Sequence, residues 1–176
     1  MSLSDSVDRY GRISRFLHWA MAVLILWQFL SAGAHFLLED TAIDKFLWPS
    51  HKPLGFLLFS LMILRTVWAI ANLSRRPASL NMAARLGHIA LYVLLFLVPA
   101  LALLRQYGSG RAFEPFGIPL ISGFEAEKIE WMVEPGNLLH GLLGWALLVL
   151  ILGHIFMAFW HRRKGGTENV MPRMWR

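Results

Sequence analysis

Four long runs of apolar residues, separated by polar segments, dominate the sequence. They cover residues 16–38, 54–71, 86–104 and 138–160, and only Arg65 interrupts the second run. Each run is close to the roughly 20 residues that a helix needs to cross about 30 Å of hydrocarbon. None shows the alternation of apolar and polar positions that marks membrane β-strands. The pattern predicts an all-α integral membrane protein, a single domain over residues 1–176 built as a four-transmembrane-helix bundle.

The composition supports a membrane-embedded chain and limits the cofactors that it can hold. Hydrophobic residues make up 56% of the 176 positions and charged residues 16%, whereas soluble domains carry about 25% charged residues. Because the chain has no cysteine, disulfides, thiolate metal sites, iron–sulfur clusters and covalently attached haem are excluded. A bound metal must take its ligands from histidine, methionine or carboxylate side chains.

The basic residues of the loops are distributed unevenly about the four runs. Eleven lie on the side of the two termini and five on the opposite side. Loops rich in lysine and arginine stay in the cytoplasm, so both termini are expected to be cytoplasmic. The opposite, periplasmic loops carry more acidic than basic residues. Membrane lipid rather than nucleic acid is therefore the partner that the net charge of +6 predicts.

Histidine positions are the most informative polar feature of the runs, because ionisable residues inside membrane spans usually mark function. His140 and His154 lie 14 residues apart in the fourth run. This spacing places them on one helix face within roughly 40°, about 21 Å apart along the axis. His18 begins the first run and His51 opens the second helix from the other side. We therefore expect His18 at the depth of His154, and His51 at the depth of His140.

Two histidine pairs at two depths are what a bundle enclosing two b-type haems requires. Neutral imidazole is also a suitable axial ligand for haem iron. Gly55 follows His51 by four residues, and Gly144 follows His140 by four, so each glycine lies on the face of its histidine. A glycine there leaves room for a flat macrocycle, although a single glycine equally suits close helix packing in a membrane.

Five short stretches carry a family resemblance when they are taken together and in order. They are Tyr10-x7-His18-Trp19, His51-Lys52-Pro53-Leu54-Gly55, Leu86-Gly87-His88, His140-x13-His154 and Met171-Pro172-Arg173. This set, which spans nearly the whole chain, resembles the bacterial cytochrome b561 family of four-helix, di-haem inner-membrane proteins that include superoxide oxidase. The resemblance implies haem b, axial ligands at His18, His51, His140 and His154, and electron exchange with a quinone such as ubiquinone.

Arg65 and His161 are candidates for roles beside the cofactors. Arg65 lies 14 residues after His51, so it shares that face at the opposite depth. We expect it to bind a propionate of the inner haem; an arginine that extends to the membrane surface is the alternative. His161 follows His154 by seven residues and lies about 10 Å nearer the cytoplasm. It is expected either at the mouth of a quinone site or among the lipid headgroups.

Two further histidines lie outside the four-ligand set. His88 opens the third helix, where a hydrogen-bonded structural role is expected, while the family resemblance leaves a role at the quinone site open. His35 points about 100° away from the face of His18 and is expected to be an outer interface residue rather than a ligand.

Local signals predict two further features of the chain. Ser50 is expected to cap the second helix. The long connection over residues 105–137 is expected to contain a short interfacial helix over residues 124–133.

Two function classes follow from the resemblance to the cytochrome b561 family. The first is an enzyme, a superoxide:ubiquinone oxidoreductase, in which electrons from superoxide cross the membrane to a quinone. The second is a quinol-linked electron-transfer subunit that serves a periplasmic partner protein. The acidic outer loops bear on this choice, since they repel superoxide unless Lys52, Arg105, Arg111 or Lys128 create a positive region. A haem-free scaffold or metal transporter gives no reason for two histidine pairs at two depths.

Overall fold

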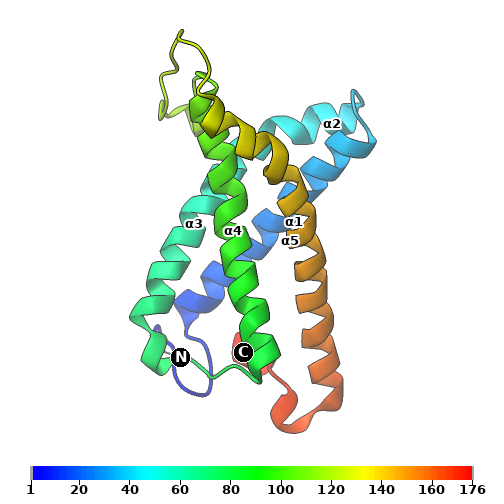
Figure 1. Cartoon of the computed structure of the whole chain (residues 1–176). Helices are drawn as coiled ribbons and strands as arrows, with labels where there is room; N and C mark the ends of the chain where they lie inside the picture. The colour runs from blue at the N-terminus through cyan, green and yellow to red at the C-terminus, as the bar shows by residue number, and fades with distance from the viewer. Residues whose placement is uncertain (1, 176) are drawn as a thin grey trace.

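Four long helices form an up-and-down bundle in the computed structural model, which describes residues 2–175 (Figure 1). They are α1 (Arg12–Leu37), α3 (His51–Ala71), α4 (Met82–Gly108) and α5 (Glu130–Lys164). All four are long and apolar enough to cross a membrane, with α3 and the short helix before it forming one candidate span over residues 42–71. The prediction of an all-α protein with four membrane-spanning helices is confirmed.

Shorter elements connect the long helices and follow the last of them. A single pair of residues, Phe113 and Ile121, forms an isolated antiparallel bridge in the α4–α5 connection. The other short elements are α2 (Ala42–Leu47), η1 (Trp48–Ser50), η2 (Leu73–Arg75), η3 (Pro115–Gly117), η4 (Gly166–Glu168) and α6 (Pro172–Trp175).

The predicted interfacial helix over residues 124–133 is wrong. Residues 124–129 are irregular, and Glu130 begins α5, which continues without interruption into the membrane span. The start of α5 is fixed against the end of α4, because the Ile129 amide donates to the Gly108 carbonyl at 2.9 Å. A Cβ on Gly108 would lie 2.6 Å from Cβ of Met132. The absence of a side chain at Gly108 therefore lets the two helix ends meet.

The predicted capping role of Ser50 is also wrong. Its side chain makes no capping hydrogen bond to α3. Instead its hydroxyl donates to the Leu47 carbonyl at 2.6 Å and accepts the indole N–H of Trp27 at 2.7 Å. The chain runs from α2 through η1 into α3 in helical conformation, so the first amides of α3 already face helical carbonyls and need no side-chain cap.

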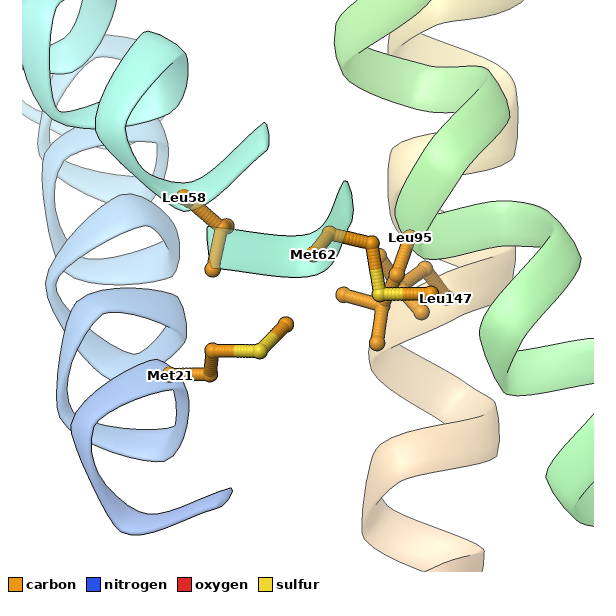
Figure 2. Packing of buried hydrophobic residues seen from close by; sticks show 5 residues of the cluster. All are labelled: Met21, Leu58, Met62, Leu95 and Leu147. Atoms are coloured by element: carbon orange, nitrogen blue, oxygen red, sulfur yellow. The ribbon is translucent and has the colours of Figure 1, made fainter. Parts of the chain in front are cut away.

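A thin apolar layer holds the middle of the bundle together. Met21 of α1, Leu58 and Met62 of α3, Leu95 of α4 and Leu147 of α5 are buried there (Figure 2). Leu147 lies seven residues from both His140 and His154, about 10 Å from each along α5. The layer therefore separates the two ends of the bundle, where the histidines lie.

The helices pack chiefly as two pairs, α1 on α3 and α4 on α5, with α3 and α4 joining them. Outward-facing side chains of these helices are large and apolar; Phe16 and Val149, for example, are 70% and 68% exposed. Apolar exposure of this extent suits a surface that faces lipid.

Both termini lie at the same end of the bundle (Figure 1). There the buried carboxylate of Asp5 accepts the Gly11 amide at 2.8 Å and forms an ion pair with Arg76 at 3.4 Å. Arg173, near the C-terminus, donates to the Ala78 carbonyl at 2.9 Å, and its own carbonyl accepts the Tyr10 amide at 3.2 Å. The N-terminal segment, the α3–α4 connection and the C-terminal segment are thus tied together, and we call this end the inner end.

Candidate functional site

The inner end holds a pair of facing imidazoles. His18 lies in the second turn of α1, and His154 lies in the last third of α5. Their ring centroids are 6.4 Å apart and their planes are inclined by 72°. The structure therefore brings together the first of the two pairs expected from the sequence.

The opposite, outer end holds a second pair of the same dimensions. His51 is the first residue of α3, and His140 lies on α5. Their ring centroids are also 6.4 Å apart, with an interplanar angle of 85°. Each pair therefore joins α5 to a helix of the α1–α3 pair, across the less closely packed side of the bundle.

The separation within each pair fits a metal bound between the two rings. A metal–imidazole bond of about 2.0–2.1 Å, with about 1.2 Å from the nitrogen to the ring centre, gives a centroid separation near 6.4 Å for two opposed ligands. Each pair offers two such ligands, and residues 2–175 contain no cluster of three or more histidine or acidic side chains able to hold a metal ion. Opposed imidazoles suit iron whose other four ligands come from a porphyrin.

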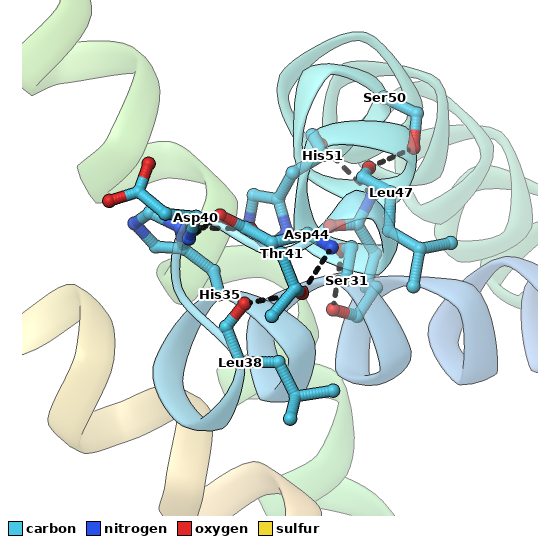
Figure 3. A network of polar contacts seen from close by, with 10 residues as sticks. Ser31, His35, Leu38, Asp40, Thr41, Asp44, Leu47, Ser50 and His51 are labelled. Atoms are coloured by element: carbon cyan, nitrogen blue, oxygen red, sulfur yellow. Dashed lines mark hydrogen bonds and ion pairs between the residues drawn. The ribbon is translucent and has the colours of Figure 1, made fainter.

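Hydrogen bonds at the outer pair leave Nε2 of both rings available to a metal. The Ser31 hydroxyl uses its hydrogen to donate to the Gln28 carbonyl at 2.9 Å, so it accepts from Nδ1 of His51 at 2.8 Å (Figure 3). Nδ1 of His140 donates to the Val98 carbonyl at 2.9 Å. Because both Nδ1 atoms carry the proton, both Nε2 atoms keep a free lone pair.

The inner pair has a different neighbour, the guanidinium of Arg65. Its Nη1 donates to Nδ1 of His18 at 3.2 Å, and its Nε donates to the Tyr92 hydroxyl at 3.2 Å. Arg65 also lies over the Tyr92 ring, 5.4 Å from the centroid. A metal on Nε2 of His18 would leave the proton on Nδ1, so Arg65 would have to turn to another acceptor. The site therefore fits a metal cofactor that brings an anionic group of its own.

His88 is the third imidazole of the inner end. Its ring centroid lies 5.5 Å from that of His154. The hydrogen-bonded structural role expected for it is not found, since neither of its ring nitrogens has a hydrogen-bond partner among the described residues. It is instead an imidazole beside the inner pair, within the electrostatic reach of Arg65 and Arg76.

His161 contacts Glu168, a residue that the sequence did not indicate as part of the site. Its Nδ1 contacts the Glu168 carboxylate at 3.2 Å, and the ammonium of Lys164 contacts the same carboxylate at 3.4 Å. The pKa of Glu168 is lowered from its ordinary value, chiefly by the hydrogen bond from His161 and further by Lys164. The ring of His161 is 12% exposed, so its position is neither deep in the bundle nor open to solvent.

A stack of rings connects the outer pair to the surface. His35 is stacked on Trp48, with centroids 3.8 Å apart and planes within 6°, and Trp48 lies 4.8 Å from His51. The buried Asp44 carboxylate accepts from Nδ1 of His35 at 3.1 Å (Figure 3). His35 therefore lies at the outer interface and belongs to neither facing pair.

Each histidine pair also has one arginine within electrostatic reach. Arg65 acts on His18 and His154, and Arg105 acts on His51 and His140. The sequence did not point to Arg105 as a partner of the outer pair. Its position at the end of α4 was visible, but its distance from His51 depends on how α3 packs beside α4.

One hollow lies at each end of the bundle. An apolar groove of about 480 Å³ at the inner end is lined by Leu17 and Leu64, neighbours of His18 and Arg65 in sequence, together with Arg12, Ile13, Phe16 and Trp68. A smaller cleft of about 260 Å³ at the outer end includes Lys52, Gln106 and Glu114. The ammonium of Lys52 donates to the Gln106 side chain there at 3.3 Å.

Comparison with known proteins identifies the family of this chain. The sequence model of prokaryotic cytochrome b561 matches residues 9–176. Cytochrome b561 homolog 2 of Escherichia coli (strain K12) is 29% identical over 174 residues, which cover 92% of this chain and 88% of that protein. The resemblance noted from the sequence is thereby confirmed. The chain belongs to the prokaryotic cytochrome b561 family and is a multi-pass b-type cytochrome of the bacterial inner membrane.

Proposed function

We propose that this cytochrome binds two haems b and moves single electrons between the periplasm and the quinone pool. His18 and His154 would hold the inner haem, and His51 and His140 the outer one. The observation that carries the proposal is the centroid separation of 6.4 Å in both pairs, the distance that two opposed axial imidazoles need. Haem b supplies a one-electron carrier at each site when it is bound.

The surroundings of the pairs support the same assignment. A Cβ on Gly144 would meet no atom within 4 Å, which leaves open space on the face of His140 one turn deeper. Gly55 is less specific, since the Gln28 side chain lies 3.7 Å from where its Cβ would be. The proposed anionic acceptor for Arg65 is a propionate of the inner haem, which a guanidinium can bind through two hydrogen bonds.

The orientation in the membrane follows from charge. The inner end carries both termini and most of the loop arginines and lysines, so we assign it to the cytoplasm. The outer pair then lies toward the periplasm. An electron donor in the periplasm would meet the outer site first, and the inner site would pass electrons to a quinone near the cytoplasmic face.

The reaction that we propose is superoxide:ubiquinone oxidoreduction. Two superoxide anions each lose one electron and leave as dioxygen, and the two electrons together with two protons convert the quinone to the quinol. Lys52, in the outer cleft, and Arg105, within reach of both outer histidines, provide positive charge where an anionic substrate must approach. They oppose the repulsion of the acidic outer loops.

The quinone side is proposed to use His161 and His88. His161 lies at the boundary of the inner end, where its Nδ1 contacts the Glu168 carboxylate, and imidazole is a side chain suited to relaying protons. His88 lies beside His154, so a quinone in contact with it would be close to the inner electron carrier. Protons and electrons could therefore reach the quinone from the same side.

An alternative function is supported by the exposed acidic residues around the start of α5. Glu125, Glu127 and Glu130 are all exposed at the outer end, and they offer a complementary surface to a basic periplasmic protein. In that case the cytochrome would be a quinol-linked electron-transfer subunit, with electrons leaving at the outer end.

Rapid mixing with superoxide tests these functions against each other. The oxidised, haem-loaded protein is mixed with superoxide, and the haem absorbance is followed with and without a soluble ubiquinone analogue. We expect fast reduction and, with the quinone, continued turnover. Absence of reduction by superoxide, together with reduction by quinol, would favour the electron-transfer subunit over the superoxide enzyme.

A further inference from the structure

The two histidine pairs differ in what faces their Nδ1 atoms. At the outer end both Nδ1–H groups donate to oxygen, to Ser31 Oγ for His51 and to the Val98 carbonyl for His140. At the inner end Nδ1 of His18 faces a guanidinium N–H, and Nδ1 of His154 has no hydrogen-bond partner in the part of the chain that the structure describes. The two outer histidines therefore each have a hydrogen-bond acceptor for Nδ1–H, and the two inner histidines have none among the described residues.

This difference acts on the electron density of the ligands. An acceptor on Nδ1–H makes an imidazole a stronger donor to a metal on Nε2. A stronger donor favours ferric over ferrous iron and so lowers the reduction potential. A ligand without such an acceptor is a weaker donor, and a nearby cation further favours the reduced form. The outer ligands thus favour a lower potential than the inner ligands do.

Fixed charge near the pairs does not reverse this difference. Each end has an arginine within electrostatic reach, Arg105 outside and Arg65 inside. Among the described arginines, only Arg65 contacts a histidine of either pair directly, and because it is a donor it offers no acceptor to the Nδ1–H that His18 would carry with a metal on Nε2. Asp44, a buried carboxylate at the outer end, is paired with His35, and Asp5, a buried carboxylate at the inner end, is paired with Arg76, so each end holds a buried carboxylate with a basic partner.

We propose that Ser31 is a positioning residue for His51 that helps make the outer site the lower-potential site, so that electrons run downhill from the periplasm to the cytoplasmic side. The proposal rests on the haem assignment above and adds a direction to it. One electron leaves a donor at the outer end, which is oxidised, and ends on the quinone at the inner end, which is reduced. Ser31 is fully buried on α1, and its hydroxyl is held by the Gln28 carbonyl with its acceptor side toward His51.

Ser31→Ala tests this proposal by potentiometric titration of the purified, haem-loaded protein. The substitution removes the acceptor on His51 and leaves the backbone unchanged. We expect two reduction potentials in the wild type, one for each haem. In the variant the lower potential should rise while the higher potential stays unchanged. The gap between the two potentials should narrow. A shift of the higher potential instead, or no shift of either, would overturn the proposal.

Matched variants separate the hydroxyl from other effects. Ser31→Thr keeps an acceptor and should keep the wild-type lower potential. Ser60→Ala removes a hydroxyl from α3 whose one hydrogen bond within the described residues goes to the Phe56 carbonyl at 3.0 Å, and it should change neither potential. If Ser31→Ala retains a single haem, Ser31→Cys is titrated in its place. Its weaker acceptor should give a smaller upward shift of the lower potential, and an unchanged lower potential there would also overturn the proposal.

Failure of the haem assignment is distinguished by haem content. A wild-type protein with fewer than two haems per chain would contradict the assignment itself. Two haems with potentials that do not respond to Ser31 would contradict the direction of electron flow and leave the assignment standing.

Discussion

Arg65 illustrates how a single charged residue inside an apolar helix can be placed by its neighbours. Tyr92 of α4 holds the guanidinium through a hydrogen bond to Nε and through its ring face. The remaining side of the guanidinium points to His18. A cation held in this way, beside a redox centre and away from bulk water, favours the reduced state of that centre.

Arg65→Leu is therefore expected to lower the potential of the inner haem. A loss of roughly 1–2 kcal/mol of electrostatic stabilisation corresponds to about 40–90 mV for one electron. Arg65→Lys keeps the charge and should show a smaller change. A redox titration in which Arg65→Leu leaves both potentials at their wild-type values would remove this role from Arg65.

His161→Ala tests the quinone side. We expect the variant to bind two haems and to be reduced normally from the outer end, but its re-oxidation by a soluble quinone should slow by about tenfold to a hundredfold. Stopped-flow re-oxidation of the pre-reduced protein measures this rate. A wild-type rate at every pH would place quinone reduction elsewhere, for example at the apolar groove between α1 and α3.

Glu168 provides the pH control for the same experiment. Its pKa is held below the ordinary value of 4.5, first by the hydrogen bond from His161. Because the pKa of Glu168 is lower in the folded protein, its ionised contact stabilises the fold above pH 4.5. This stabilisation is lost as the pH falls through the lowered pKa of the folded state. Glu168 thus stays ionised from pH 5 upward, and Glu168→Gln should not remove a pH dependence of the re-oxidation rate observed in that range.

Sequence spacing located the histidine pairs but not their hydrogen-bond partners. The positions of His140 and His154 depend on one helix, whose period is known. Ser31, Asp44 and Arg105 act on histidines of other elements, and their contacts depend on how α1, α2 and α4 pack against those elements. A buried hydroxyl on α1 could be noted in the sequence, but the histidine that it faces could not.

At the scale of elements, the helix ends differ from the apolar runs that predicted them. The length of an apolar run reflects the thickness of the hydrocarbon that it crosses. The helix itself continues as far as its backbone hydrogen bonds do. The helix α5 therefore begins at Glu130 and ends at Lys164, well beyond the predicted run over residues 138–160. Its early start depends on two glycines, Gly108 of α4 and Gly136 of α5, where the two helices make close contact.

Gly136→Ala is expected to destabilise this contact. The new Cβ would lie 2.6 Å from Cβ of Arg105 and 2.8 Å from the Leu101 carbonyl oxygen, neither of which can move without shifting α4. Overpacking of this kind costs about 1–3 kcal/mol, and thermal unfolding in detergent should show a lower midpoint. Gly141→Ala on the same helix meets no atom within 4 Å and should be neutral or slightly stabilising. Equal midpoints for the two variants would mean that the close approach of α4 and α5 does not limit stability.

At the scale of the whole molecule, charge separates the two ends. The inner end ties three segments together through Asp5, Arg76 and Arg173. The outer end presents exposed acidic side chains and a cleft that contains Lys52 and Glu114. The distribution of basic residues predicted that both termini share one side and that Lys52 and Arg105 lie on the other, but only the fold brings Arg105 within electrostatic reach of His51.

Lys52→Gln is expected to reduce the rate of reduction by superoxide by about threefold to tenfold at low ionic strength, because it removes local steering of an anion. Added salt should shrink the difference between variant and wild type. Lys128→Gln, which changes an exposed lysine of the α4–α5 connection, serves as the control and should have a smaller effect. Equal rates for Lys52→Gln and the wild type at low salt would exclude steering by Lys52.

The haem content of the purified protein and of its single histidine variants tests the central claim most directly. We predict two haems per chain in the wild type, one inner haem in His51→Ala and His140→Ala, and one outer haem in His18→Ala and His154→Ala. The pairing follows from the two centroid separations of 6.4 Å across the bundle. A wild type with a single haem, or any of the four variants with two haems and an unchanged bis-histidine spectrum, would contradict the account.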